Sequence, residues 1–382
     1  MHSIEVSDMP ELRPRQPSIH PLDLWNCLWT GSSVGDAIES EQQLLKRFVH
    51  SPWQLGRVRV DLPKLGIGKQ YINTLVVNPD VAHGTPIVWT HGAGAGLGFG
   101  YRNFDPLANP KKGAKRRLIA FDWLGQAGSS RPSYPYGGVR PSWTLSHDEL
   151  VSRAIDFSVE SLEAWREQMH LDEFDLIAHS MGGYLASHYA MRYPERVRRL
   201  VLISPVGWAE MPKGELAKAR ASGMLGFLWD SKLGNFGLAK LLGRSVRTLA
   251  KNAVVGRFGI RDEEERRLVS DYFWDHLTSQ PISAEMAVNY LLVPFVPPAP
   301  FGFYARRPVS TEDPQLLAML PPTTLLYGSH DLHYIPTMPE AVTVVQQAAR
   351  SPVTMRHVAH SDHHLYLDNP RDFHAEVERA LA

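Results

Sequence analysis

The chain has 382 residues, of which 43% are hydrophobic and 10% aromatic, which is sufficient for a large core. Its 40 basic and 40 acidic residues balance, so it lacks the basic excess of a nucleic-acid-binding protein and we expect no such partner. The single cysteine, Cys27, excludes an intramolecular disulfide and fits a reducing compartment. No apolar run is long enough for a transmembrane helix, and residues 1–10 resemble neither a secretory signal nor an Arg-rich transit peptide.

The first segment, residues 1–50, is predicted to be an irregular, proline-containing arm followed by a helix that ends near Phe48. Trp25 and Trp29 lie close together in this segment. Such a pair indicates either an apolar clasp on the core or an anchor at a membrane interface. Without a partner in view, the clasp is the favoured interpretation.

Residues 51–206 are predicted to form the first part of an α/β core, and residues 316–382 the second part. The alternating pattern from Gly56 to Val77 predicts a hairpin at a sheet edge. Apolar strands are predicted at 86–90, 117–121, 175–179, 200–203, 323–328 and 353–358. Helical patterns such as that of residues 148–169 separate them. This alternation is typical of a parallel sheet covered by helices on both faces.

Residues 207–315 differ in pattern and are predicted to be a largely helical cap inserted into the core. Between Met211 and Arg257, nine Lys and Arg residues face only two acidic residues and are interleaved with leucines and aromatics. Two interpretations stay open: a solvated basic face, or peripheral contact with an anionic membrane or lipid surface.

The central motif is Ala178-His179-Ser180-Met181-Gly182, which follows an apolar strand and precedes a helical stretch. A strand, a sharp turn and a helix with small residues two before and two after a serine are the context of a nucleophile elbow. Ser180 is therefore the candidate nucleophile, and the alternative is a serine in an ordinary turn.

A serine nucleophile needs a base, and the base needs an orienting carboxylate. Asp331 follows the strand that ends at Gly328, and it is the candidate acid or otherwise a turn residue. His363 lies in the loop after the last strand and is favoured as base over His364. The other two nearby histidines are less suitable: His357 belongs to the strand pattern, and His360 is too close to the strand end.

The oxyanion of an acyl-transfer reaction requires backbone N–H donors. Met181 directly follows the candidate nucleophile, and Ala93, with Gly94 beside it, lies in a glycine-rich loop after a strand. That loop lacks a Walker lysine and the Rossmann spacing, so it does not predict a phosphate site. No metal-ligand spacing is evident, and we expect neither a metal nor another cofactor.

Five motifs in order resemble one family. They are His91-Gly-Ala-Gly-Ala-Gly96, Tyr101-Arg-Asn-Phe-Asp-Pro-Leu107, the stretch 120–132, Ala178-His-Ser-Met-Gly-Gly183 and His363-His-Leu-Tyr-Leu-Asp368. Together they resemble the α/β-hydrolase family that contains cardiolipin deacylases, N-acyl-phospholipid and lysophospholipid lipases, and lipid-droplet lipase coactivators. The resemblance implies an acyl-ester hydrolase for phospholipids or lysophospholipids with Ser180, Asp331 and His363 as triad. The likeness runs from about residue 50 to the C-terminus and is weakest through the cap.

Two departures from this family stand beside the nucleophile and the base: Ala178 replaces the first glycine of the elbow, and Asp362 replaces the glycine before the histidine. The Asp362 carboxylate would either increase the basicity of His363 or compete with Asp331 for its ring. The family's His-x4-Asp motif has been read as an acyltransferase signature, whereas the simpler reading places Asp368 in the region of the final helix cap.

We therefore predict an acyl-lipid hydrolase that is cytoplasmic and peripheral to membranes or lipid droplets, with mitochondria as the alternative location. The alternatives are acyl transfer to a lysophospholipid by the same residues, and a lipid-surface scaffold with little activity. The coactivator members lack the serine that this chain keeps, which favours an enzyme. Head group, acyl position, chain length and oligomeric state are not predicted.

Overall fold

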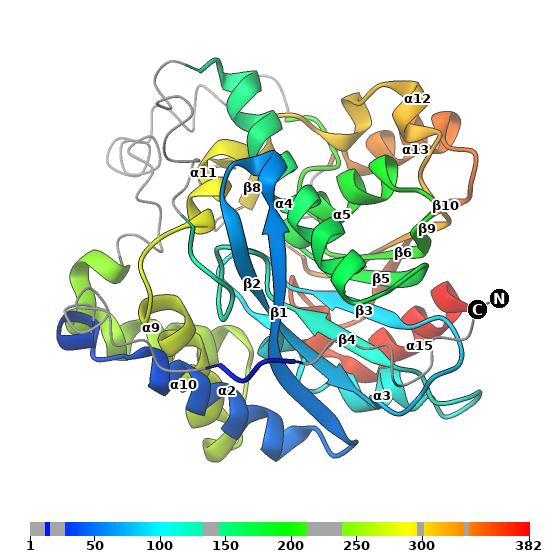
Figure 1. Cartoon of the computed structure of the whole chain (residues 1–382). Helices are drawn as coiled ribbons and strands as arrows, with labels where there is room; N and C mark the ends of the chain where they lie inside the picture. Colours follow the sequence, from blue (N-terminus) through cyan, green and yellow to red (C-terminus); the bar gives the residue numbers. More distant parts are fainter. Residues whose placement is uncertain (1–11, 16–26, 133–144, 212–238, 296–301, 332–335) are drawn as a thin grey trace.

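The computed structural model describes residues 12–15, 27–132, 145–211, 239–295, 302–331 and 336–382. An eight-stranded sheet runs through the molecule in the order β1-β2-β4-β3-β5-β6-β9-β10 (Figure 1). Its strands are β1 Trp53–Leu62, β2 Gly68–Val77, β3 Ile87–Thr90, β4 Leu118–Phe121, β5 Phe174–His179, β6 Val197–Ile203, β9 Thr323–Gly328 and β10 Val353–Val358. The predicted hairpin is confirmed: β1 and β2 pair antiparallel at one edge, and β2 also runs antiparallel to β4.

From β4 to β10 all neighbouring strands are parallel, as predicted. Successive residues of these strands enter different cores: Leu176 packs with one apolar cluster and Ile177 with the other. Because side chains alternate across a sheet, a sheet that is buried on both faces needs strands that are apolar throughout.

Helices cover the two faces of the sheet. On one face lie α4 (His147–Gln168), α5 (Met181–Arg192) and α13 (Met338–Ala348), and on the other α3 (Phe104–Ala108) and α15 (Pro370–Leu381). The predicted cap of the final helix is confirmed, since the Asn369 side chain accepts a hydrogen bond from the Asp372 amide at 3.3 Å.

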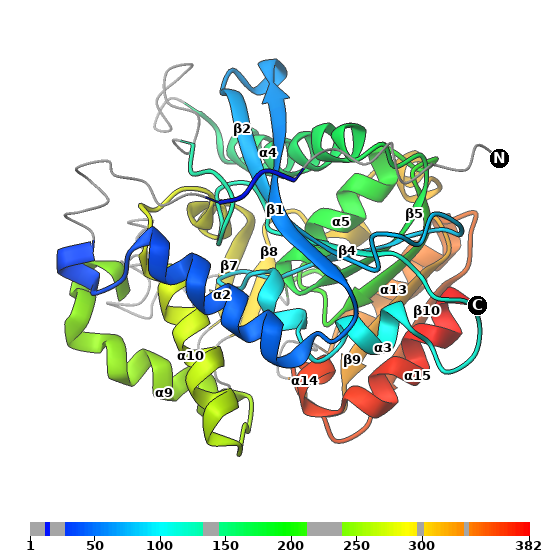
Figure 2. The ribbon, with the colours of Figure 1, turned by 60° about the horizontal axis from the view of Figure 1, so that its bottom comes forward.

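The chain between β6 and β9 forms a separate group of elements. In the described residues they are η5 Gly243–Val246, α9 Arg247–Arg257, α10 Glu263–Thr278, η6 Ala284–Met286, α11 Ala287–Leu291, β7 Leu292–Phe295, β8 Gly302–Ala305, η7 Val309–Thr311 and α12 Pro314–Leu317. β7 and β8 pair antiparallel as a two-stranded sheet, which the sequence did not predict. Figure 2 shows α2 (Val34–Phe48) beside α10, so α2 packs on this insertion.

Candidate active site

Ser180 sits at the sharp turn between β5 and α5, where the sequence placed an elbow. Its backbone has φ 54° and ψ −121°, a conformation that costs free energy for a residue other than glycine. The turn is closed by small residues: a Cβ on Gly182 would overlap the carbonyl oxygen of His91, and Ala178 is fully buried. The elbow thus forms with alanine in place of the first glycine.

The structure brings the three predicted side chains together. The Nε2 atom of His363 lies 2.9 Å from Ser180 Oγ, and its Nδ1 atom lies 3.4 Å from Asp331 Oδ1. The side chain of Asp331 is fully buried just beyond the end of β9, and that of His363 is 8% exposed. The candidate nucleophile, base and acid therefore meet beyond the carboxyl ends of three parallel strands, β5, β10 and β9.

The other three histidines of this region take different places. His357 is exposed on β10, and His360 is exposed in a left-handed conformation with φ 51°. The ring of His364 packs against Phe258 at a centroid distance of 4.7 Å, and its centroid lies 5.2 Å from that of His363. Of the four, only His363 contacts Ser180 through its ring among the described residues.

Asp362 contacts the backbone of the candidate base. Its Oδ1 atom accepts a hydrogen bond from the His363 amide at 2.7 Å, and its Oδ2 atom pairs with Arg257 at 2.9 Å. Its own amide donates to Asp368 at 2.9 Å, so Asp368 lies beside the α15 cap but holds the base loop. Burial raises the pKa of Asp368, although this hydrogen bond and Arg257 lower it.

The predicted oxyanion donors lie on the two segments that flank Ser180. Met181 is the first residue of α5, and Ala93 and Gly94 follow Gly92 in the loop after β3. A Cβ on Gly92 would lie only 2.8 Å from the Cβ of Ser180, so this loop passes directly over the nucleophile. Gly94 has φ 67°, which lets the chain turn away again.

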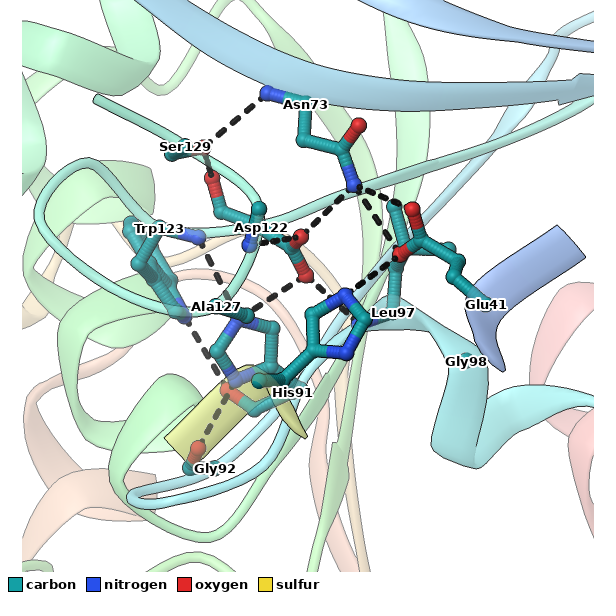
Figure 3. Close-up of polar contacts among 12 residues, drawn as sticks. Glu41, Asn73, His91, Gly92, Leu97, Gly98, Asp122, Trp123, Ala127 and Ser129 are labelled. Atoms are coloured by element: carbon teal, nitrogen blue, oxygen red, sulfur yellow. Dashed lines mark hydrogen bonds and ion pairs between the residues drawn. The ribbon is translucent and has the colours of Figure 1, made fainter. Parts of the chain in front are cut away.

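Asp122, which the sequence analysis did not assign, holds that loop in place (Figure 3). Its Oδ1 atom accepts the Leu97 amide at 2.6 Å, and its Oδ2 atom accepts the Gly128 amide and the Asn73 side chain at 2.9 and 2.8 Å. Asn73 in turn donates to Glu41 at 3.1 Å. A fully buried aspartate just after β4 thus connects the loop after β3 to β2 and, through Asn73, to α2.

His91, at the start of the same loop, is also structural. Its Nδ1 atom donates to the Gly92 carbonyl at 2.8 Å, and its Nε2 atom accepts the Trp123 amide at 3.3 Å, which fixes the tautomer. Burial lowers the pKa of His91, so the ring is neutral and keeps both hydrogen bonds. The Trp123 indole N–H donates back to the His91 carbonyl at 3.0 Å.

His179 is a further residue that the sequence analysis did not assign. It precedes the nucleophile, and its Nε2 atom donates to the His363 carbonyl at 3.0 Å. Its ring centroid lies 4.8 Å from that of His363. The strand that carries the nucleophile therefore also supports the loop that carries the candidate base.

The described ranges lack two kinds of feature, a metal-binding cluster and a membrane-spanning helix. No group of three or more His, Cys, Asp or Glu side chains is placed there to hold a metal ion. None of the helices there combines the length and hydropathy that crossing a membrane requires.

The chain is similar to known proteins both in sequence and in fold. A family model described as "alpha/beta hydrolase fold" matches residues 85–232. The chain is 32% identical to a "1-acylglycerol-3-phosphate O-acyltransferase" of Arabidopsis thaliana, over 92% of this chain and 83% of that protein. It is also 32% identical to a "(Lyso)-N-acylphosphatidylethanolamine lipase" of Mus musculus, over 80% and 81%. A solved "membrane phospholipase A" shares the fold, with a TM-score of 0.56, 17% identity, and coverage of 91% of this chain and 90% of that one.

Proposed function

The chain belongs to the α/β-hydrolase family of acyl-lipid lipases and acyltransferases, and on that premise we propose that it is a serine hydrolase of fatty-acyl esters. Its substrate would be a phospholipid or lysophospholipid. The observation that carries the proposal is the 2.9 Å contact between Ser180 Oγ and His363 Nε2, with Asp331 buried behind the imidazole. That arrangement is what activates a serine hydroxyl toward an ester carbonyl.

The reaction runs through an acyl-enzyme. Ser180 attacks the ester carbonyl while His363 takes the hydroxyl proton, and Asp331 holds the ring and stabilises the imidazolium. The amides of Met181 and Ala93, with Gly94 beside them, bind the oxyanion. His363 then gives its proton to the departing alcohol, and water repeats the sequence to release the fatty acid. The cap, residues 207–315, is proposed to receive the acyl chain.

Acyl transfer is the second candidate, and the name of the plant relative favours it. In this reaction the hydroxyl of a lysophospholipid replaces water as acceptor, and the same residues act. Supplying a labelled lysophospholipid separates the two reactions, because only transfer produces labelled diacyl lipid. A third candidate is a lipid-surface scaffold, in which Ser180 would not react with a fluorophosphonate probe.

The decisive experiment is lipid mass spectrometry on a mixed phospholipid extract incubated with wild type or with Ser180→Ala. One lipid class should fall and its lyso product should rise with wild type only. The variant should lose roughly 10⁴- to 10⁶-fold in rate, as in other serine triads. Unchanged lipids with both proteins, together with binding to vesicles, would favour the scaffold.

We also propose that the protein contacts a lipid surface through one patch. Its apolar members are exposed: Leu28, Trp29, Leu241, Leu242 and Leu249. The indole of Trp29, 51% exposed, donates to the Lys240 and Leu241 carbonyls at 3.0 and 3.1 Å, so the N-terminal segment and the insertion meet here. The clasp prediction is therefore wrong for Trp29, whereas Trp25 lies outside the described residues.

Cations accompany this apolar patch. Arg244, Arg247 and Lys251 lie on η5 and α9, and Arg247 donates to the Gly31 carbonyl at 3.3 Å. Exposed leucines and tryptophan beside cations are the composition that binds an anionic interface. Such contact would hold the protein at a membrane or lipid droplet from the cytoplasm. Lys213, Lys218, Arg220 and Lys232 of the predicted basic segment lie outside the described residues.

A further inference from the structure

Arg257, the last residue of α9, joins the insertion to the loop that carries the proposed base. Its guanidinium Nη1 lies 2.9 Å from Asp362 Oδ2. The two side chains are 38% and 26% exposed, so the pair is partly shielded from water. The contact exists because this chain has Asp362 where the family that it resembles usually has glycine.

The Asp362 carboxylate uses its other oxygen on the base itself. Oδ1 accepts the His363 amide at 2.7 Å, and the Asp362 amide is held by Asp368 at 2.9 Å. One carboxylate therefore bridges a cap cation and the backbone of His363. A shift of Arg257 would move the backbone from which the imidazole reaches Ser180.

Two more contacts connect the same loop to the insertion. Phe258 packs on the His364 ring at 4.7 Å, directly after Arg257 in sequence. Arg102 donates to the Leu367 carbonyl at 3.0 Å and is itself paired with Glu265 of α10 at 2.7 Å. Residues 362–367 are thus held by Arg257 and Phe258 at the end of α9 and, through Arg102, by Glu265 of α10.

We propose that Arg257 is a positioning residue for the base, acting through Asp362 on the backbone and electrostatics of His363. This inference rests on the proposed function. It gives the insertion a second task besides receiving the acyl chain, because α9 then determines whether His363 stands at proton-transfer distance from Ser180. Small displacements of a catalytic group can cost a large factor in rate.

The test removes the charge of Arg257 or of Asp362. If their contact were purely structural, these two substitutions would not shift the pH profile of activity in opposite directions. Asp331 and Ser180 face the His363 ring, the His179 and His364 rings lie 4.8 and 5.2 Å from it, and the carboxylates of Asp362 and Asp368 flank its backbone. Arg257 neutralises Asp362. Removing Arg257 leaves an uncompensated anion that favours the imidazolium, whereas removing the charge of Asp362 leaves a cation that disfavours it.

The variants are Arg257→Gln, Asp362→Asn, the double variant and Arg257→Lys, assayed with a soluble short-chain nitrophenyl ester. We expect each single variant to lower kcat about three- to tenfold with KM unchanged, a size that fits a partly exposed pair. The acid limb of kcat/KM should move up in pH for Arg257→Gln and down for Asp362→Asn, by roughly half a pH unit. In the double variant the acid limb of kcat/KM should return to its wild-type pH while kcat stays low. In Arg257→Lys both the pH of this limb and kcat should equal those of wild type.

Arg47→Gln is the matched control, because Arg47 pairs with Glu264 of α10 at 3.0 Å far along the chain from the base loop. If Arg257→Gln behaves like Arg47→Gln in both kcat and pH profile, Arg257 has no positioning role. Ser180→Ala is run in the same assay. Activity that survives in Ser180→Ala, or is absent from wild type, would defeat the proposed function and this inference with it. Serine-dependent activity with unaffected Arg257→Gln would defeat this inference alone.

Discussion

At Gly182 the elbow closely approaches the loop after β3, which is proposed to bind the oxyanion. A methyl group there would overlap the His91 carbonyl oxygen, and His91 begins the loop over Ser180. We therefore predict that Gly182→Ala displaces the Ala93 amide from the oxyanion. Loss of one such donor costs about 10²- to 10³-fold in kcat. Ester turnover, measured beside the melting temperature, should show a much larger loss of rate than of stability.

Gly256→Ala is the matched control for that substitution. No atom lies within 4 Å of a Cβ at this position in α9, and alanine favours a helix by up to about 1 kcal/mol over glycine. Its turnover should equal wild type and its melting temperature should rise slightly. Wild-type turnover in Gly182→Ala as well would show that the loop is not fixed by the elbow.

The residues that meet at the site differ in how well a sequence reveals them. Ser180, Asp331 and His363 were predicted because each follows a strand and nucleophile chemistry demands their types in that order. Asp122, His91 and His179 were not assigned, because they act by bonding to backbone groups. Backbone amides and carbonyls recur all along a chain, so no residue type or spacing marks the ones that Asp122, His91 and His179 contact.

The helices and strands of the core were predictable from local sequence patterns. The strands, the edge hairpin, α4 and the Asn369 cap depend on local patterns of apolar and capping residues. The strands β7 and β8 were missed, because each is four residues long and Pro294 lies within the first. The packing of α2 on α10 was also missed, because contact between helices so distant in sequence leaves no local signal.

The patch on η5, α9 and the preceding residues gives a prediction for lipid binding. Leu249 is 72% exposed and Leu241 is 56% exposed, so replacing them should not disturb the fold. Leu241→Asp and Leu249→Asp should each weaken binding to anionic phosphatidylglycerol vesicles at least about tenfold. Each removes an apolar side chain that would be buried in the lipid and adds a negative charge that the vesicle repels. Co-sedimentation measures this, and turnover of a soluble ester should be unchanged.

Leu316→Asp is the matched control for the patch. Leu316 is 43% exposed on α12, away from the cations of α9. It should bind vesicles like wild type. Equal binding by all three variants would contradict the proposed lipid contact.

At the scale of the whole molecule, one buried carboxylate joins distant parts of the chain. Glu41 of α2 is fully buried and contacts Arg15 at 2.7 Å, Asn73 of β2 at 3.1 Å and His276 of α10 at 3.3 Å. Burial alone would raise the pKa of Glu41, but Arg15 and His276 together lower it from 4.5 to about 2. Its folded pKa is depressed, so its stabilisation is complete above about pH 4.5 and is lost as the pH falls toward 2.

We predict that Glu41→Gln lowers the free energy of unfolding at pH 7 by about 3 to 5 kcal/mol, as expected when one member of a buried pair is removed. Between pH 5 and 3 the variant should lose less stability than wild type, because it lacks a group that takes up a proton on unfolding. Urea unfolding at several pH values measures both. Glu264→Gln is the control, because the Glu264 side chain pairs with Arg47 but is 53% exposed. It should change the free energy of unfolding by less than about 1 kcal/mol. If the free energy of unfolding changed equally with pH in Glu41→Gln and wild type, the lowered pKa assigned to Glu41 would be contradicted.

The wide separation of Ser180 and His363 also bears on how the protein is made. They stand 183 residues apart, and the strands that precede the proposed acid and base, β9 and β10, are the last of the sheet to be synthesised. At ribosomal speeds of about 5 to 20 residues per second, the serine exists for roughly 10 to 40 s before its base is polymerised. During that interval β6 has no β9 beside it and Ser180 has no proton acceptor. On the proposed mechanism, a nascent chain therefore has no esterase activity, and activity begins only when the final strands close the sheet.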